Sequence, residues 1–115
     1  MRFIAAAFTT AMLVLFRPVV ASASEPIKIV LTLKDHRFIP AIVSAPAGRK
    51  LRIELTNLDA ASEEFDSGDL KVEEDVTPRG HVSFTIGPLA PGSYSFMGEA
   101  HPTTALGRIA VTPTK

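Results

Sequence analysis

The 115-residue sequence contains no cysteine. Without a thiol the chain can form no disulfide, carries no cysteine nucleophile and offers no thiolate to a metal ion. It also lacks the cysteine to which a lipobox-type lipid anchor is attached. A blue-copper centre depends on a copper–thiolate bond, so electron transfer through such a centre is excluded on chemical grounds.

An excess of charge of one sign is also absent, because 12 Lys and Arg residues balance 12 Asp and Glu residues. This balance does not favour binding to nucleic acid or to an anionic membrane. Motifs of hydrolases, zinc proteases and phosphate-binding loops are missing as well. Since the length suits one domain, we expect a small binding protein rather than a multidomain enzyme.

A long apolar run is missing too. The uncharged stretch from Phe3 to Phe16 is shorter than the roughly 20 residues that span a bilayer. It follows the basic start Met1-Arg2 and precedes the small-residue motif Ala21-Ser22-Ala23. This pattern predicts a secretory signal peptide over residues 1–23, cleaved to leave residues 24–115 as a mature secreted domain.

Alternation of apolar and polar residues dominates the rest of the chain, and no stretch keeps helical spacing for three turns. The clearest half-buried strands are Ile27–Lys34 and Leu51–Thr56. The apolar segment Phe38–Ala45 contains Pro40, which favours an edge or irregular strand. Further strands are expected near Glu63–Ser67, Leu70–Val76, Val82–Ile86, Tyr94–Phe96 and Arg108–Thr112. The sequence predicts an all-β fold, a Greek-key β-sandwich or barrel of seven to eight strands.

Four segments in this order resemble the cupredoxins: Pro46-Ala47-Gly48, the Leu51–Asn57 strand, the Gly87–Gly92 corner and Tyr94–His101. The resemblance covers nearly the whole predicted mature domain. It implies a cupredoxin-like fold in which a loop after the Asn-containing strand and the last loop carry metal ligands. In blue-copper members these ligands are a His, a Cys, a second His and usually a Met.

By this resemblance the four ligand positions fall at Glu63, at Gly98 or Met97, at His101 and near Leu106, so only His101 keeps its residue type. Other donors stand around these positions. The predicted metal-ligand candidates are Glu63, Glu64 and Asp66 from one strand, Met97, Glu99 and His101 from the closing loop, and His36 from the end of the first strand.

Strand alternation separates the three acidic candidates. Glu63 stands two positions before the apolar Phe65 and should face the interior, whereas Glu64 and Asp66 should point outward. Glu63 is therefore the better inner ligand candidate. The alternative is that all three carboxylates form a solvated rim without a ligand role.

The remaining candidates also have structural alternatives. Glu99 and His101 are two residues apart and can project to the same side of an extended loop. His101 could equally be a loop histidine bonded to the backbone, and Met97 could fill a gap in the core. His36 is a candidate because Asp35-His36-Arg37-Phe38 recurs in one subgroup of the resembling proteins. His81 is expected to be an exposed strand residue without a role.

That subgroup is linked with bacterial iron uptake, and the segments Glu63–Ser67 and Phe96–Pro102 resemble it. The resemblance implies a periplasmic metal-binding protein with a copper or iron ion, handling iron, with copper assisting, for a membrane iron permease. Copper-assisted oxidation of ferrous iron is the one enzymatic activity left open. The alternative function is a metal-free β-sandwich that serves as a binding or assembly module.

Overall fold

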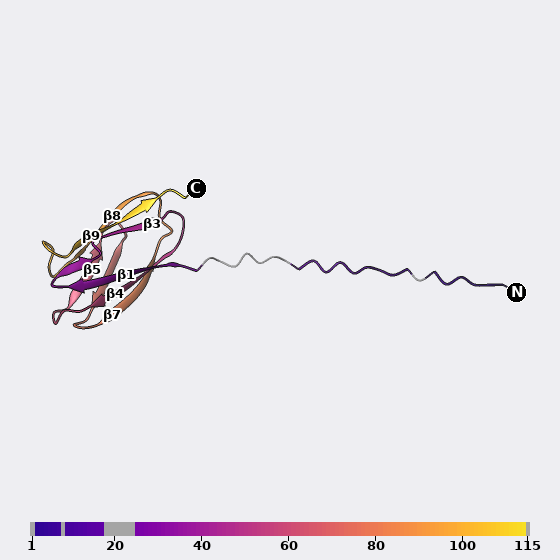
Figure 1. Cartoon of the computed structure of the whole chain (residues 1–115), viewed down its shortest axis with the longest axis horizontal. Coiled ribbons are helices and arrows are strands. Elements are labelled where there is room, and N and C mark those ends of the chain that lie inside the picture. Colours follow the sequence, from indigo (N-terminus) through magenta and orange to yellow (C-terminus); the bar gives the residue numbers. More distant parts are fainter. Residues whose placement is uncertain (1, 8, 18–24, 115) are drawn as a thin grey trace.

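The computed structural model describes residues 2–7, 9–17 and 25–114. Residues 2–7 and 9–17 carry no helix or strand (Figure 1). Within the described ranges, no helix has the length and apolar character needed to cross a membrane. The cleavage motif at residues 21–23 lies outside the described residues, so the signal peptide over residues 1–23 stays a prediction.

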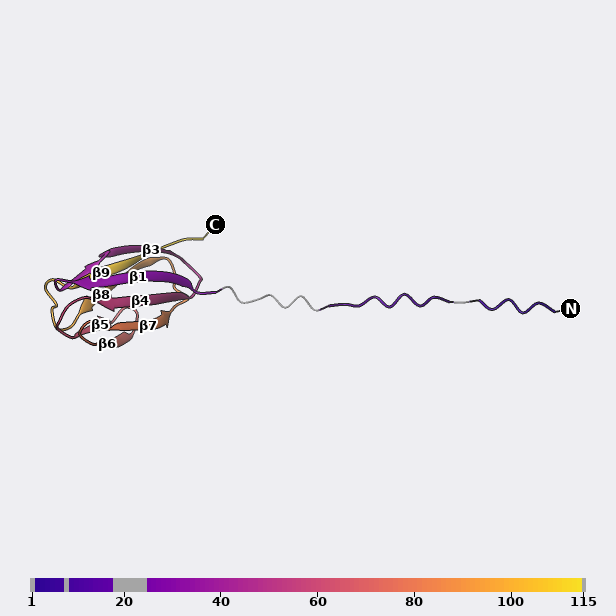
Figure 2. The same cartoon turned by 60° about the horizontal axis from the view of Figure 1, so that its bottom comes forward.

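Nine strands form two sheets that face each other (Figures 1 and 2). One sheet has four strands in the order β2-β1-β4-β7, and the other has five in the order β3-β9-β8-β5-β6. The predicted all-β sandwich is confirmed. The strands are β1 (Ile27–Lys34), β2 (Arg37–Ile39), β3 (Ile42–Pro46), β4 (Leu51–Asn57), β5 (Glu63–Ser67), β6 (Val72–Val76), β7 (His81–Ile86), β8 (Gly92–Gly98) and β9 (Leu106–Thr112).

The segment predicted as one edge strand, Phe38–Ala45, is two edge strands in different sheets. β2 pairs antiparallel with β1, whereas β3 pairs parallel with β9 in the other sheet. Pro40 lies between them and has no N–H to donate to a strand ladder, so the chain can leave one sheet there and join the other. This crossing accounts for nine strands rather than seven or eight.

The core is made by the inner faces of both sheets. β1 and β4 run parallel with Ile29 opposite Ile53 and Leu31 opposite Leu55, and all four side chains are buried. The five-stranded sheet contributes mainly aromatic and branched residues: Phe65, Val76, Phe96, Ile109 and Val111. The apolar alternation in the sequence therefore marks the buried faces correctly.

Phe65 is the centre of an aromatic cluster within this core. Its ring is fully buried and stacks on Phe96 at 4.8 Å between centroids, with Phe84 at 5.0 Å and Phe38 at 6.0 Å. Such pairs contribute about 0.5–1.5 kcal/mol each beyond the burial of area. The cluster joins strands of both sheets.

The outer face of the four-stranded sheet carries a polar network around Glu54, which is only 8% exposed. Arg52 Nε lies 2.7 Å from one carboxylate oxygen of Glu54, and His81 Nε2 lies 2.7 Å from the other. The same imidazole contacts Thr56 Oγ1 through Nδ1 at 3.0 Å. His81 is exposed as expected, and it links two neighbouring strands across the sheet.

We predict that this network makes stability depend on pH. The hydrogen bond to His81 is the main cause that lowers the pKa of Glu54 below its ordinary value of 4.5, and the charge of Arg52 adds to it. A lowered carboxyl pKa in the folded state stabilises the protein above pH 4.5, and this stabilisation is lost as the pH falls through the folded-state pKa. In urea denaturation, the free energy of unfolding should therefore fall less between pH 6 and pH 3 for Glu54→Gln than for the wild type. Parallel pH profiles of the two proteins would contradict this.

Candidate functional site

One end of the sandwich collects the β1–β2 turn, the start of β5 and the β8–β9 loop. In the turn, Asp35 and His36 have φ angles of 52° and 57°, a conformation that needs local support in residues other than glycine. Asp59 gives that support, because its carboxylate accepts the backbone N–H of Asp35 at 2.8 Å and that of His36 at 3.0 Å. The β4–β5 loop thereby fixes the turn that presents His36.

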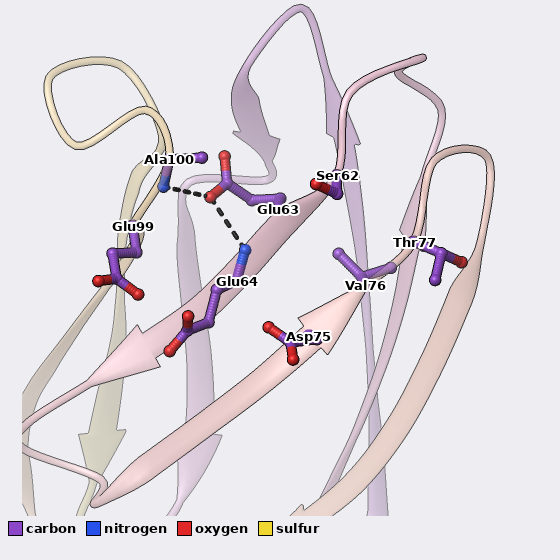
Figure 3. A pocket seen from close by; sticks show the side chains of 8 residues that line it. All are labelled: Ser62, Glu63, Glu64, Asp75, Val76, Thr77, Glu99 and Ala100. Atoms are coloured by element: carbon purple, nitrogen blue, oxygen red, sulfur yellow. Dashed lines mark hydrogen bonds between the residues drawn. The ribbon is translucent and has the colours of Figure 1, made fainter.

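Glu63, the first residue of β5, points inward as predicted and is 3% exposed. Its Oε1 atom accepts the backbone N–H groups of Glu64 at 3.0 Å and Ala100 at 2.8 Å (Figure 3). Its Oε2 atom lies 2.6 Å from His101 Nδ1. With the carboxylate as acceptor, this contact places a proton on Nδ1, and in the neutral imidazole Nε2 then carries none.

Gly98 provides the space for this carboxylate. A Cβ atom at position 98 would lie 2.6 Å from Glu63 Cδ and 2.7 Å from Ala105 Cβ, closer than real contacts allow. Gly98 is the inward-facing one of the two positions at which the resemblance places the blue-copper cysteine. A side chain there and the Glu63 carboxylate would compete for the same volume.

His36 packs directly on His101. The two imidazole rings are stacked, with 3.7 Å between centroids and 11° between planes. His36 Nδ1 is buried and has no hydrogen-bond partner, since the nearest oxygen of Asp59 lies 3.6 Å away. A buried nitrogen without a partner is uncommon in folded proteins and marks this ring as a candidate ligand.

The inner group offers two imidazole rings and a carboxylate but no thiolate, so its donor types suit imidazole coordination of a metal ion rather than thiolate coordination. A coordinating imidazole places the ion in its own ring plane, and the His36 and His101 planes are nearly parallel, so coordination by both requires one ring to turn. In the described ranges of the chain, no group of three or more His, Cys, Asp or Glu side chains is arranged to hold a metal ion.

Glu64 and Glu99 form a separate acidic group on the other side of β5. They line an open groove of about 550 Å³ together with Asp75 of β6 and with Glu63, whose carboxylate points away from theirs (Figure 3). A hydrogen bond with Glu99, which requires one of the two carboxyls to be protonated, raises the pKa of Glu64 to about 7, with partial burial and the charges of Glu99, Asp75 and Glu73 adding to the shift.

Asp66 and Met97 are also separated from the two histidines. They lie opposite each other in the β5–β8 register on the outer face of the sheet, and Met97 is 38% exposed. Met97 is therefore not core filler. The seven candidates thus divide into an inner group of Glu63, His101 and His36 and an outer group of Glu64, Asp66, Met97 and Glu99.

Two residues that shape the inner group carry only weak sequence signals. Asp59 belongs to a polar loop, Asn57–Ser62, of the composition that favours turns, which marks a loop but not its contact with His36. Gly98 stands in a strand interior, where glycine often indicates close approach of another group. Neither signal names the partner.

The sequence matches the cupredoxin-like domain family over residues 4–111. It is also similar to the uncharacterized protein RP394 of Rickettsia prowazekii (strain Madrid E), with 40% identity over 85 residues that cover 74% of this chain and 68% of that protein. The family match includes the strands that carry the inner group.

Solved structures share the fold at low identity. Auracyanin A, a "blue" copper protein from Chloroflexus aurantiacus, superposes with a TM-score of 0.66 at 15% identity over 76% of this chain and 100% of that chain. The metal-binding domain of the Cu(I)-exporting P-type ATPase CopA of Streptococcus pneumoniae D39 was solved with Cu(I). It superposes with a TM-score of 0.66 at 15% identity over 74% of this chain and 84% of that chain. With the family match over most of its length, this chain belongs to the cupredoxin-like domain family.

Proposed function

We propose that this protein binds a transition-metal ion at His101 and His36, with Glu63 holding His101 in the orientation for binding. The observation that carries the proposal is the 2.6 Å contact of the buried Glu63 carboxylate with His101 Nδ1. Histidines that bind metals usually donate their second ring N–H to such a carboxylate, which fixes the tautomer and raises the basicity of the free nitrogen. Glu63 thus acts through His101.

The chemistry of the donors limits the metal. Imidazole nitrogens suit copper, zinc, iron and nickel, and with no thiolate a blue-copper centre is excluded. When bound, a copper or iron ion would supply one-electron chemistry at this end of the sandwich. Copper is the first ion to test, because the similar structures named above include a blue copper protein and a domain solved with Cu(I).

The physiological role we propose is handling of iron, with copper assisting, in the periplasm and for a membrane iron permease. Support for this finer role comes from the segments Glu63–Ser67 and Phe96–Pro102, which resemble those of proteins linked with iron uptake. The predicted signal peptide over residues 1–23 supports the compartment. Oxidation of ferrous iron by a bound copper ion would be the associated reaction.

Metal titration of the purified protein tests the site. We expect one Cu(II) per chain, and a loss of affinity of about 10- to 100-fold in Glu63→Gln, where the carboxylate that orients His101 becomes a neutral amide. His101→Ala and His36→Ala should each weaken binding at least as much. His81→Ala is the matched control, because His81 lies on β7 and bonds Glu54 instead.

Isothermal titration calorimetry with Cu(II), repeated anaerobically with Fe(II), gives both stoichiometry and affinity. The Cu(II) complex should lack the intense charge-transfer band that a thiolate ligand produces. Equal affinities for the wild type, His101→Ala and His36→Ala would overturn the proposal and favour a metal-free binding module. A loss of affinity in His81→Ala alone would instead place the metal site on the outer face of the four-stranded sheet, around Glu54 and His81.

A further inference from the structure

The outer face of the five-stranded sheet presents an apolar strip. Cross-strand register places Met97 opposite Leu106, and Ile42 opposite Arg108, so these side chains share one face. Ile42 is 56% exposed and Leu106 49% exposed, and with Met97 they line an open groove of about 470 Å³. The exposed fractions of these side chains show that no described element of the chain covers this strip.

The same face is strongly acidic beside the strip. In the β5–β6 register Glu64 lies opposite Asp75 and Asp66 opposite Glu73, and Glu99 extends the group past the end of β8. None of these five carboxylates forms a salt bridge with a described residue. Like charges directly opposite each other destabilise a sheet. On β6, which is an edge strand, such charges also hinder pairing with another sheet.

We propose that this face docks a basic protein partner whose contact surface sets an apolar centre beside Lys and Arg side chains. Exposed apolar grooves with a charged rim are typical of interaction sites, and complementary charge speeds and orients docking. The acidic half argues against a second copy of this chain, which would bring five more carboxylates to the interface. The metal proposal is not needed for this docking.

The face also lies next to the inner group, because Glu64 directly follows Glu63 and Glu99 is two residues before His101. A partner seated on the groove would therefore approach the end of the sandwich that carries both histidines. Docking and metal binding can still be measured separately, because docking is measured with EDTA present, which removes metal ions.

A defined probe tests the docking face: a short peptide of alternating Lys and Leu, titrated into the ¹⁵N-labelled protein with EDTA present. We expect amide shifts on β5, β8 and β9, and about tenfold weaker binding for the double variant Met97→Ser/Leu106→Ser. Asp66→Asn/Glu73→Gln should weaken binding by a similar factor. Peptide binding by this double variant should also lose less affinity than binding by the wild type when the ionic strength rises from about 0.05 M to about 0.5 M.

Val30→Ser is the control, because Val30 is 57% exposed on the four-stranded sheet. This substitution should leave the affinity for the peptide unchanged. A peptide with Glu in place of Lys should not bind, and thermal melts confirm that each variant is folded. Shifts centred on another face, or unchanged affinity in Met97→Ser/Leu106→Ser, would overturn the proposal. Concentration-dependent shifts of the same amides without peptide would assign the face to a second copy and overturn it equally.

Discussion

Replacing Phe65 by alanine is expected to lower the free energy of unfolding by about 3–5 kcal/mol. The side chain is fully buried and its ring contacts Phe38, Phe84 and Phe96, so the substitution leaves a cavity where strands of both sheets meet. The total free energy of unfolding of a small domain is only about 5–15 kcal/mol. If the wild type lies at the lower end of that range, a substantial fraction of the variant should be unfolded.

Urea denaturation followed by circular dichroism measures this loss, with Val30→Ala as the control for an exposed apolar position on β1. The control should change stability by less than about 0.5 kcal/mol. A Phe65→Ala variant within 1 kcal/mol of the wild type, with an unchanged dependence on urea, would mean that the cluster collapses around the cavity or is not the centre of the core.

Gly98→Ala is expected to cost about 1–3 kcal/mol and to break the contact between Glu63 and His101. The added methyl group would lie 2.6 Å from Glu63 Cδ and 2.7 Å from Ala105 Cβ, so the carboxylate must leave its position or β8 must shift. Movement of the carboxylate would leave two backbone N–H groups at its Oε1 atom without an acceptor. Adding a single methyl group at position 98 should thus displace the Glu63 carboxylate of the inner group.

Gly68→Ala is the matched control, because a Cβ there meets nothing within 4 Å and its φ needs no glycine. Proton NMR at low temperature should detect the His101 Nδ1 proton in the wild type and in Gly68→Ala, and lose it in Gly98→Ala. If both alanine variants keep this proton and the same melting temperature, Gly98 does not make the space that Glu63 occupies.

Strand alternation allowed the fold and half of the site to be predicted. The period of two in Glu63–Ser67 correctly placed Glu63 and Phe65 inward and Glu64 and Asp66 outward, because successive side chains of a strand point to opposite faces. The same rule applies to β8, where Phe96 and Gly98 are buried and Met97 is exposed. The geometry of single strands is local, so the sequence contains it.

Contacts between loops could not be predicted in the same way. The stacking of His36 on His101 joins positions far apart in the chain, and it depends on two positive φ angles supported by Asp59 from a third segment. Six of the seven donors lie on two short segments, which suggested one ligand set with His36 from a third segment. Alternation places Glu64 and Asp66 on the outer face, but no spacing in the sequence reveals that His36 joins His101 at the inner end.

The position of β9 bears on how the chain folds. β9 is the last strand in chain order, and it lies between β3 and β8 in the five-stranded sheet. Pairing of β3 with β9 therefore waits for a contact between distant parts of the chain, and sheets built from such contacts form in milliseconds to seconds. Until β9 arrives, the facing edges of β3 and β8 have free backbone groups. A chain truncated before Leu106 would keep those edges open and should aggregate rather than fold.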